Sequence, residues 1–548
     1  MAKSKSNEFI AQGSILAVAS ILVRIIGMIY RIPMTSIIGD EGNALYSYAY
    51  SIYTILLLMS SYSLPLAVSK MVSARVEQGQ WKNVERTFQC AILFALLVGT
   101  VFALLVLVGA KAFTSVLYKD ELAAIALRFM APTILIMALL GVFRGFFQGL
   151  QTTKPTAVSQ LLEQIINAVV SVAGAWFLFS YGAGMNKTLG ADGLDSAWGA
   201  AGGALGTGAG ALTALIFVFV LYLRFRKTLT TQVRQDRTGT QESYENLFRV
   251  LLAIAVPVIL STAVYNLIDL VDGSLFSYYM TTTGRDMVDR QRMWGAYSGK
   301  CLLLIHIPVS ISSAMAVSLV PSLTAAYSSG KMKLVYKKIN AIMKFTSTVA
   351  FPSAVGLMIL AHPIVKTLFP GDSSDAWKYL VTGGIAVVMF SLSTITNSIL
   401  QGIDRMKVPM FHSVISLGAH VAAAAILMWV FHLGIYGMII GYSCFGLMMT
   451  ILNLISLRNY IGYHLNWVKT IFMPFLCSLV MGAACYAVYR LTGLILPGRA
   501  LPMLLAVIAA VAVYAVIILK TGLMNERDLN DLPMGGRLVR LAKKTRLL

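Results

Sequence analysis

The stretch AILFALLVGTVFALLVLVGA, residues 91–110, contains no charged residue. A helix rises about 1.5 Å per residue, so a run of this length spans about 30 Å, the thickness of the hydrocarbon core of a bilayer. The run LPMLLAVIAAVAVYAVIIL, residues 501–519, is of the same kind. The apolar run at 421–457 is too long for one crossing, and we predict a break near Gly434. These runs indicate an integral membrane protein.

The composition of the whole chain agrees with this class. The chain has 548 residues, of which 57% are hydrophobic and 12% charged, and its mean hydropathy is +0.75. A water-soluble core of this size needs no such excess of apolar residues. We predict an all-α polytopic membrane protein with about fourteen transmembrane helices, near residues 10–38, 44–72, 88–110, 122–147, 157–180, 197–223, 247–279, 297–327, 341–366, 376–402, 409–431, 435–457, 470–489 and 500–520.

The basic residues lie mainly on one side of these predicted helices. With the amino terminus in the cytoplasm, the inner segments hold 25 Lys and Arg and the outer segments hold 8. This asymmetry predicts that both termini are cytoplasmic. The largest inner clusters are residues 224–237, 331–338 and 537–548. Anchoring to anionic lipids accounts for them and for the net charge of +21, so we predict no nucleic-acid partner.

The amino-terminal segment and the cysteines indicate neither a secreted protein nor a disulfide-bonded or metal-binding one. MAKSKSNEF leads into a full-length apolar segment without a signal-peptide cleavage site, so we expect the first helix to remain as an anchor. The five cysteines form no CxxC pair and no ligand spacing with histidine. The sequence therefore predicts neither a disulfide framework nor a metal site.

An internal repeat indicates two related halves. FFQGLQTTKP (146–155) ends the fourth predicted helix and ILQGIDRMKVP (399–409) ends the tenth, and in both a lysine follows the QG glycine by five residues. Pro65 and Pro321 are separated by nearly the same number of residues as the glycines of the two QG pairs. We predict an amino-terminal six-helix lobe, a carboxy-terminal six-helix lobe, and two added helices with a basic tail, at residues 1–240, 241–460 and 461–548. Transporters built from such repeats bind substrate between the halves.

No predicted extramembrane segment exceeds about 30 residues, which leaves no room for a soluble catalytic domain. We therefore expect a transporter and no catalytic residues. Because ionisable residues within the bilayer are unfavourable unless they face protein or water, each of them is a candidate functional residue.

Two arginines lie within the first predicted helix. Arg31 follows Arg24 by seven residues, about two helical turns, so both are expected on one face. Two planar guanidinium groups along a cavity wall suit a diphosphate. The alternative is that both extend to the interface or pair with carboxylates. Pro33 removes a backbone donor just after them, so we expect the helix to bend there.

Further charged candidates lie in three other predicted helices. Lys300 enters the eighth helix from outside, where it either offers a positive charge in the other half or serves as an interfacial anchor. Asp269 and Asp272 share a face of the seventh helix near Asn266, which suggests an ion-coupling site; the alternative is charge balance for the arginines. Glu163 of the fifth helix is assigned a structural or gating role, like Pro33.

For Glu163 we expect an ion pair with Arg144 or Lys154, or stabilisation of the helix start.

Several segments, in this order along the chain, resemble the polysaccharide-transport and flippase branch of the multidrug/oligosaccharidyl-lipid/polysaccharide exporter superfamily. The resemblance is greatest to the stage V sporulation protein B type and to lipid II flippases. The segments are RIIGMIYRIPMTSIIGDEGNALYSYAYSIY, SLPLAVSKMVSA, FRGFFQGLQTTKPTAVSQLLEQI, IPVSISSAMAVSLVPSLTAAYSSG and SILQGIDRMKVP.

This resemblance implies two six-helix lobes in a V around a central cavity, with two further helices forming a groove for a lipid tail. It also implies that Arg24, Arg31 and Lys300 correspond to cavity-facing cations. The second helix here has no arginine in its membrane part. Asn167 and His420 stand where relatives often carry basic residues.

The leading hypothesis is a flippase that moves an undecaprenyl-diphosphate-linked saccharide, lipid II or a related polysaccharide precursor, across the bacterial cytoplasmic membrane by alternating access. The alternatives are a cation-coupled multidrug exporter of the same superfamily, and a membrane glycosyltransferase using Asp40 and Glu41. We expect no cofactor, and leave a coupling monovalent cation open. The expected partners are the lipid-linked substrate and membrane lipids, and the expected state is a monomer. The identity of the saccharide and a role in wall growth or sporulation stay open.

Overall fold

Helices make up nearly all of the chain. The computed structural model describes residues 19–20, 22–370, 374–526, 540 and 543, and these ranges contain no β-strand. The chain divides into two compact units, Met1–Gly299 and Lys300–Leu548. The division into 1–240, 241–460 and 461–548 stays a prediction.

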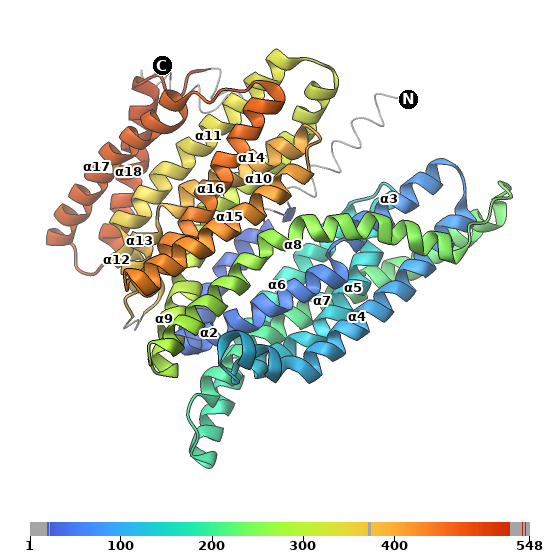
Figure 1. Ribbon diagram of the computed structural model, residues 1–548, viewed down its shortest axis with the longest axis horizontal. Coiled ribbons are helices and arrows are strands. Elements are labelled where there is room, and N and C mark those ends of the chain that lie inside the picture. The colour runs from blue at the N-terminus through green and yellow to red at the C-terminus, as the bar shows by residue number, and fades with distance from the viewer. Residues whose placement is uncertain (1–18, 21, 371–373, 527–539, 541–542, 544–548) are drawn as a thin grey trace. The chain divides into compact units, whose positions relative to one another are not determined.

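The amino-terminal unit contains long helices joined by short turns. Its α6 and α7 lie side by side as an antiparallel pair (Figure 1). The helices are α2 (Arg31–Leu57), α3 (Leu64–Glu77), α4 (Trp81–Tyr118), α5 (Ala123–Gly149), α6 (Lys154–Leu189), α7 (Leu194–Gln235), α8 (Tyr244–Thr282) and α9 (Met287–Ala296), with π-helical turns at Leu58–Tyr62 and Tyr297–Cys301.

In the carboxy-terminal unit, the last two helices, α17 and α18, pack against each other, and α17 also packs on α11 (Figure 1). The helices are α10 (Leu302–Ser328), α11 (Met332–Ile359), α12 (Ala361–Leu368), α13 (Ala376–Gly383), α14 (Ala386–Gly402), α15 (Lys407–Ala425), α16 (Ile435–Ile461), α17 (Met473–Ile495) and α18 (Ala500–Lys520). Two π-helical turns, Ile426–Val430 and Val468–Phe472, complete it. The expected break near Gly434 is confirmed, because α16 begins directly after this residue.

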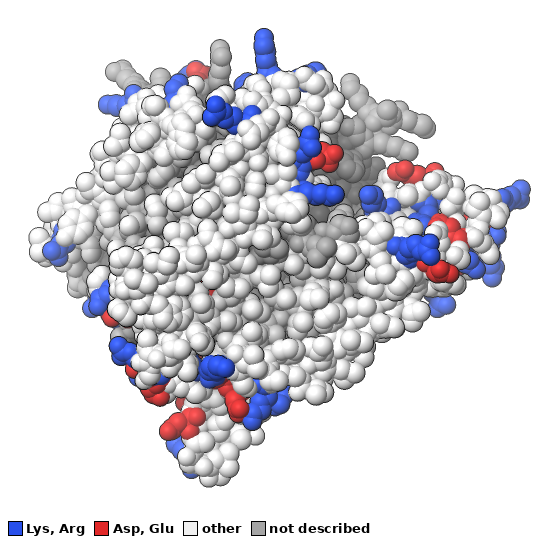
Figure 2. Space-filling model, viewed as in Figure 1, with Lys and Arg blue, Asp and Glu red and all other residues white. Residues whose placement is uncertain are grey.

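The surface matches a membrane environment. In the visible face of each unit, uncharged side chains cover the middle and charged ones gather towards the ends (Figure 2). Within the described residues, eleven helices are long and apolar enough to cross a membrane, or twelve if the bent pair α13 and α14 forms one span. The all-α polytopic class is therefore confirmed. The count of fourteen stays a prediction: residues 10–18 and 21 of the first expected span lie outside the described residues, and α8, expected as the span 247–279, is not among the eleven helices.

The chain reverses within α2. Gly39 has φ 68° and ψ −174°, outside the helical range, so α2 consists of two helical parts. Glycine adopts a positive φ readily because it lacks a Cβ. The helix before α2 is interrupted at Tyr30, three residues before Pro33, where a bend was expected. Pro33 has no N–H to donate to the carbonyl one turn earlier, which weakens the helix at this point.

The two segments that indicated the repeat have the same local structure. α5 and α14 both end at the QG glycine, and the residues two positions later, Gln151 and Asp404, have left-handed φ values of 58° and 60°. The next helices, α6 and α15, both begin at the following lysine. In each unit the preceding proline-containing helix packs on the QG helix, α3 on α5 and α10 on α14.

Small residues permit the close approach of α6 and α7. A Cβ on Gly206 of α7 would lie 2.1 Å from the Ser171 hydroxyl oxygen of α6, and one on Gly202 would lie 2.1 Å from the Gly174 carbonyl oxygen. Helices within membranes associate through such small-residue contacts because lipid provides no hydrophobic driving force. This contact fixes the position of α6, which carries Glu163 and Asn167.

Gly206→Val is expected to separate α6 from α7 and to lower the free energy of unfolding in detergent by about 1–3 kcal/mol, as overpacking does elsewhere. Thermal unfolding of the purified protein measures this. The control is Gly184→Val in α6, where a Cβ would meet no atom within 4 Å. Equal melting temperatures for the two variants would contradict the packing argument.

The link between α7 and α8 is fixed to the start of α4. The Asp236 carboxylate accepts a hydrogen bond from the Lys82 backbone N–H at 2.8 Å, which holds the pKa of that carboxyl below its usual value. Asn83 donates to the Thr240 carbonyl at 3.2 Å and accepts from the Glu242 N–H at 3.0 Å. These bonds place the amino-terminal end of α8, the helix that carries Asp269 and Asp272.

Arg75 of α3 completes this attachment by donating two hydrogen bonds of 2.7 Å to the Glu242 carboxylate. Because the pair is largely buried, Glu242→Gln is expected to lower the unfolding free energy by about 1–3 kcal/mol. Glu245→Gln, which removes a highly exposed partner of Arg249, serves as the control and is expected to change it by under about 1 kcal/mol. Chemical unfolding in detergent measures both; similar losses would contradict a specific role for Glu242.

Candidate functional site

Tyrosines surround the guanidinium of Arg31 at the start of α2. The guanidinium carbon lies 5.6 Å from the centre of the Tyr50 ring, within the range of a cation–π interaction. The Tyr46 ring stacks on that of Tyr50 at 5.7 Å, and the Tyr53 ring lies 5.9 Å from it. Tyr30 and Tyr46 also interact electrostatically with Arg31. We call Tyr30, Tyr46, Tyr50 and Tyr53 the tyrosine cluster.

The reversal at Gly39 brings these residues together. In an unbroken helix, residues 31 and 50 would lie roughly 28 Å apart. Tyr46, Tyr50 and Tyr53 follow at intervals of four and three residues, so they share one face of the second helical part.

The Tyr30 hydroxyl connects the cluster to the α6–α7 contact. It accepts a hydrogen bond from the Asn167 side chain at 3.4 Å, and the Asn167 oxygen accepts one from Ser171 at 2.8 Å. Ser171 also donates to the Gly203 carbonyl of α7 at 2.9 Å. The glycine-rich face of α7 thus helps to position Tyr30 next to Arg31.

Within the described residues, the charge of Arg31 has no ion-pair partner. Among the described residues, no carboxylate lies within salt-bridge distance of its guanidinium. Asp269 of α8 lies within electrostatic reach of Arg31 and interacts with Asp272. Arg31 also makes a side-chain hydrogen bond with Tyr30. The Tyr50 ring contacts the face of the guanidinium and occupies none of its five N–H donors, since these lie in its plane, so the donors that Tyr30 does not use remain for an anion.

The candidate ion-coupling residues of α8 differ in exposure. Asp269 is exposed, Asn266 is half-buried, and only 2% of the Asp272 surface is accessible. Asp269 and Asp272 lie close enough for their charges to interact. No group of three or more His, Cys, Asp or Glu suited to a metal ion occurs in the part of the chain that the structure describes.

Glu163 forms an ion pair with Arg144, one of its two expected partners. The Arg144 Nη2 lies 2.7 Å from the Glu163 carboxylate, and Arg144 Nε donates to the Ser159 hydroxyl at 2.9 Å. Both charged side chains are largely buried. The pair joins α5 to α6, and Glu163 interacts electrostatically with Tyr53 of the tyrosine cluster.

Lys300 and Arg24 occupy contrasting environments. Lys300 lies in the π-helical turn Tyr297–Cys301 and is buried. Its amine lies 3.4 Å from the Ser374 hydroxyl and 5.9 Å from the centre of the Phe369 ring. The side chains of Arg24 and Pro33 are exposed.

A second cluster joins α9 to the turn between α4 and α5. The buried carboxylate of Asp120 accepts a hydrogen bond of 2.7 Å from Gln291 and lies 3.9 Å from the guanidinium of Arg290. Arg290 also donates to the Lys119 carbonyl at 2.9 Å. Burial raises the pKa of the Asp120 carboxyl above its usual value, although the hydrogen bond from Gln291 and the charge of Arg290 oppose this shift.

An aromatic stack lies beside this cluster. The Tyr48 ring is 4.3 Å from that of Tyr118 and 6.0 Å from that of Trp294. The Tyr48 hydroxyl accepts a hydrogen bond from Ser277 at 3.1 Å. Contacts between α2, α4, α8 and α9 therefore hold one end of the amino-terminal unit together.

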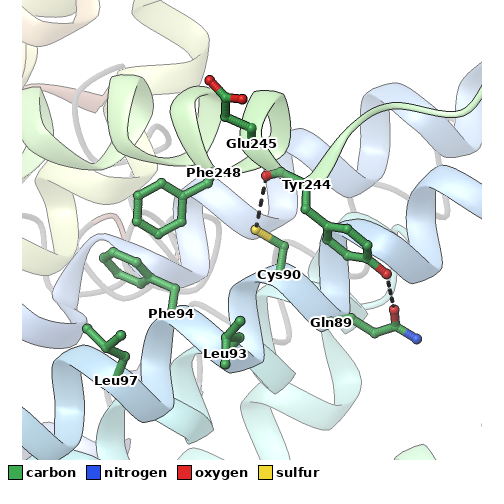
Figure 3. Close-up of a pocket in the computed structure, with 8 residues that line it drawn as sticks. All are labelled: Gln89, Cys90, Leu93, Phe94, Leu97, Tyr244, Glu245 and Phe248. Carbon is green, nitrogen blue, oxygen red and sulfur yellow. Dashed lines mark hydrogen bonds between the residues drawn. The ribbon is translucent and has the colours of Figure 1, made fainter.

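A groove between α4 and α8 has a mainly apolar lining, unlike the surroundings of Arg31. Its volume is about 540 Å³, and the rings of Phe94 and Phe248 pack edge to face beside each other in its lining, with their centres 5.6 Å apart (Figure 3). At its polar end the Tyr244 hydroxyl donates to the Gln89 side chain at 2.8 Å, and Glu245 points away from the groove (Figure 3). Its apolar lining suits a hydrocarbon chain and not a diphosphate. The lining residues are Gln89, Cys90, Leu93, Phe94, Leu97, Tyr244, Glu245 and Phe248.

Comparison with known proteins identifies the family. The family model described as polysaccharide biosynthesis protein matches residues 9–327. The chain belongs to the polysaccharide biosynthesis protein family. It is 25% identical to lipid II flippase MurJ of Bacillus subtilis (strain 168) over 415 residues, 74% of each protein. It is 22% identical to stage V sporulation protein B of the same organism over 528 residues, 96% of this chain and 98% of that protein.

A solved structure has the same fold. The inward closed conformation of lipid II flippase MurJ matches with a TM-score of 0.65 at 15% identity, covering 92% of this chain and 97% of that one. This member of the polysaccharide biosynthesis protein family is thus a multi-pass membrane transporter of the exporter superfamily and not an enzyme. The glycosyltransferase alternative is also weakened because Glu41 forms an ion pair with Arg292 at 2.9 Å.

The sequence pattern indicated Arg31, Glu163 and Asp269 as candidate functional residues, but it did not indicate the tyrosines of this family member. Their spacing along residues 46–53, which places three aromatic rings on one helical face, was a usable signal. The roles assigned to the selected residues, including Arg24, Lys300 and Asp272, stay predictions.

Proposed function

We propose that this polysaccharide biosynthesis family member moves an undecaprenyl-diphosphate-linked saccharide across the bacterial cytoplasmic membrane by alternating access. The relatives named lipid II flippase support this substrate class. The observation that carries the proposal is the Arg31 guanidinium, which is held by aromatic rings without an ion-paired carboxylate among the described residues. A diphosphate supplies the oxygen acceptors that such a group binds best.

In this proposal the other cations have supporting roles. Arg24 offers a second guanidinium in the helical segment that precedes α2, and Lys300 offers a positive charge beyond the first unit. The polyprenyl tail stays in lipid, and both termini of the transporter are cytoplasmic. The transport cycle requires the substrate or a coupling force to favour the two openings differently.

A monovalent cation at Asn266, Asp269 and Asp272 is the proposed coupling ion. The proximity of Asp269 to both Asp272 and Arg31 supports it, because cation binding between the carboxylates would change the field at the arginine. Replacing sodium with choline at constant pH tests the choice of ion. Unchanged transport under this replacement would exclude sodium.

The test of the function is leaflet transfer in liposomes that contain the purified protein. A fluorescent undecaprenyl-diphosphate-linked saccharide is expected to reach the opposite leaflet without covalent change, as measured by quenching of the accessible fluorophore. Uptake of a cationic drug without transfer of the saccharide lipid would support the multidrug exporter instead. Transfer of neither would overturn both assignments.

A further inference from the structure

The ring that contacts Arg31 is itself held in place. The Tyr46 ring lies nearly parallel to that of Tyr50, with 14° between their planes, and Tyr53 packs at 43°. Tyr46 and Tyr53 are buried, whereas Tyr50 and Arg31 are half-buried. Tyr50 is therefore packed against two buried rings, with part of its surface still accessible.

An aromatic support differs chemically from a carboxylate. A carboxylate would occupy the edge of the guanidinium with hydrogen bonds and neutralise its charge, so that a phosphate would have to displace it. A ring attracts the cation through its face and accepts no hydrogen bond along the guanidinium edge. The contact thus orients Arg31 and preserves both its charge and its donors.

We propose that Tyr50 is a positioning residue that presents the edge of the Arg31 guanidinium to the diphosphate of the substrate. This inference rests on the proposed function, in which Arg31 binds that diphosphate. Without the ring, the flexible arginine side chain adopts more conformations, and ordering it on binding lowers the affinity. The ring, and not the hydroxyl, carries this role.

The experiment measures the affinity of the purified protein for undecaprenyl diphosphate in detergent, together with KM and kcat for leaflet transfer. Tyr50→Leu is expected to weaken binding and raise KM by about 3- to 30-fold, in line with the range of cation–π interactions. Tyr50→Phe is expected to stay within about twofold of the wild type, because Phe retains the ring face. Tyr62→Leu, which removes an exposed tyrosine that follows α2, is the matched control and is expected to change neither.

A second series keeps the size of the side chain. Phenylalanines with an increasing number of fluorine atoms at position 50 withdraw electrons from the ring, so the affinity is expected to fall stepwise with each fluorine. This series applies even where Tyr50→Leu does not fold. An affinity independent of fluorination would overturn the inference.

The double variant separates this inference from the proposed function. If Tyr50 acts through Arg31, the affinity of Arg31→Ala with Tyr50→Leu equals that of Arg31→Ala alone. A further loss in the double variant would show that Tyr50 acts independently of Arg31 and would overturn the inference. Loss of affinity in Arg31→Ala with wild-type affinity in Tyr50→Leu would overturn only the inference. Wild-type affinity in Arg31→Ala would overturn the proposed function itself.

Discussion

Arg31→Ala is expected to lower the rate of leaflet transfer by about 100-fold. The variant loses charge-assisted hydrogen bonds to the diphosphate, which are worth about 1.5–3 kcal/mol each, and each factor of ten in rate corresponds to about 1.4 kcal/mol. Fluorescence quenching in liposomes measures the rate. Melting temperature and protein recovery should stay near those of the wild type, because Arg31 is half-buried and contributes no ion pair among the described residues.

The matched control for this prediction is Arg128→Ala, which removes an exposed arginine from α5. Its transfer rate is expected to stay within about twofold of the wild type, as for a charge that extends to the membrane interface. Arg31→Lys should lie between the two, because lysine keeps the charge but lacks the planar fork. Equal rates for Arg31→Ala and Arg128→Ala would argue against a substrate role for Arg31.

Arg290→Ala is expected to have the largest effect on stability, a loss of about 3 kcal/mol in unfolding free energy. The substitution leaves the buried Asp120 carboxylate without its cationic neighbour and removes the hydrogen bond to the Lys119 carbonyl. Unfolding by heat or denaturant in detergent measures the loss. Arg285→Ala, in the preceding turn and exposed, is the control and should be nearly neutral.

The loss of unfolding free energy in Arg290→Ala should depend on pH. Burial already raises the pKa of Asp120, and the charge of Arg290 opposes this shift, so its removal raises the pKa further. A carboxyl with a raised folded-state pKa binds its proton more tightly in the folded protein. Its stabilising contribution is therefore present at low pH and lost as the pH rises through that pKa. The stability difference from the wild type is expected to be larger near about pH 8 than near about pH 5; the opposite trend would contradict the role of Asp120.

Much of the fold could be predicted because the bilayer imposes simple rules. Uncharged runs such as 91–110 locate helices, and the break near Gly434 follows from the length of one crossing. Arg31 stood out because a charge at bilayer depth needs a reason to be there. These inferences use only local sequence and the properties of lipid.

Contacts between distant residues could not be predicted in this way. The approach of Tyr50 to Arg31 depends on the backbone conformation of Gly39, and a glycine alone does not specify a reversal. Asp120 and Arg290 lie in segments predicted as outer loops, and their contact arises only from tertiary packing. For Lys300 the sequence left a cavity-facing and an interfacial position open, and it gave no indication that the side chain would be buried beside Ser374.

We propose that this transporter recognises a lipid-linked diphosphate. The most direct measurement compares the wild-type rates of leaflet transfer for two lipids with the same saccharide and polyprenyl chain, one joined by a diphosphate and one by a monophosphate. The account predicts that the diphosphate lipid is transferred at least about tenfold faster, since the loss of one phosphate removes acceptors for about 1.4 kcal/mol or more of charge-assisted hydrogen bonding. Equal rates for the two lipids, or transfer of neither, would contradict it.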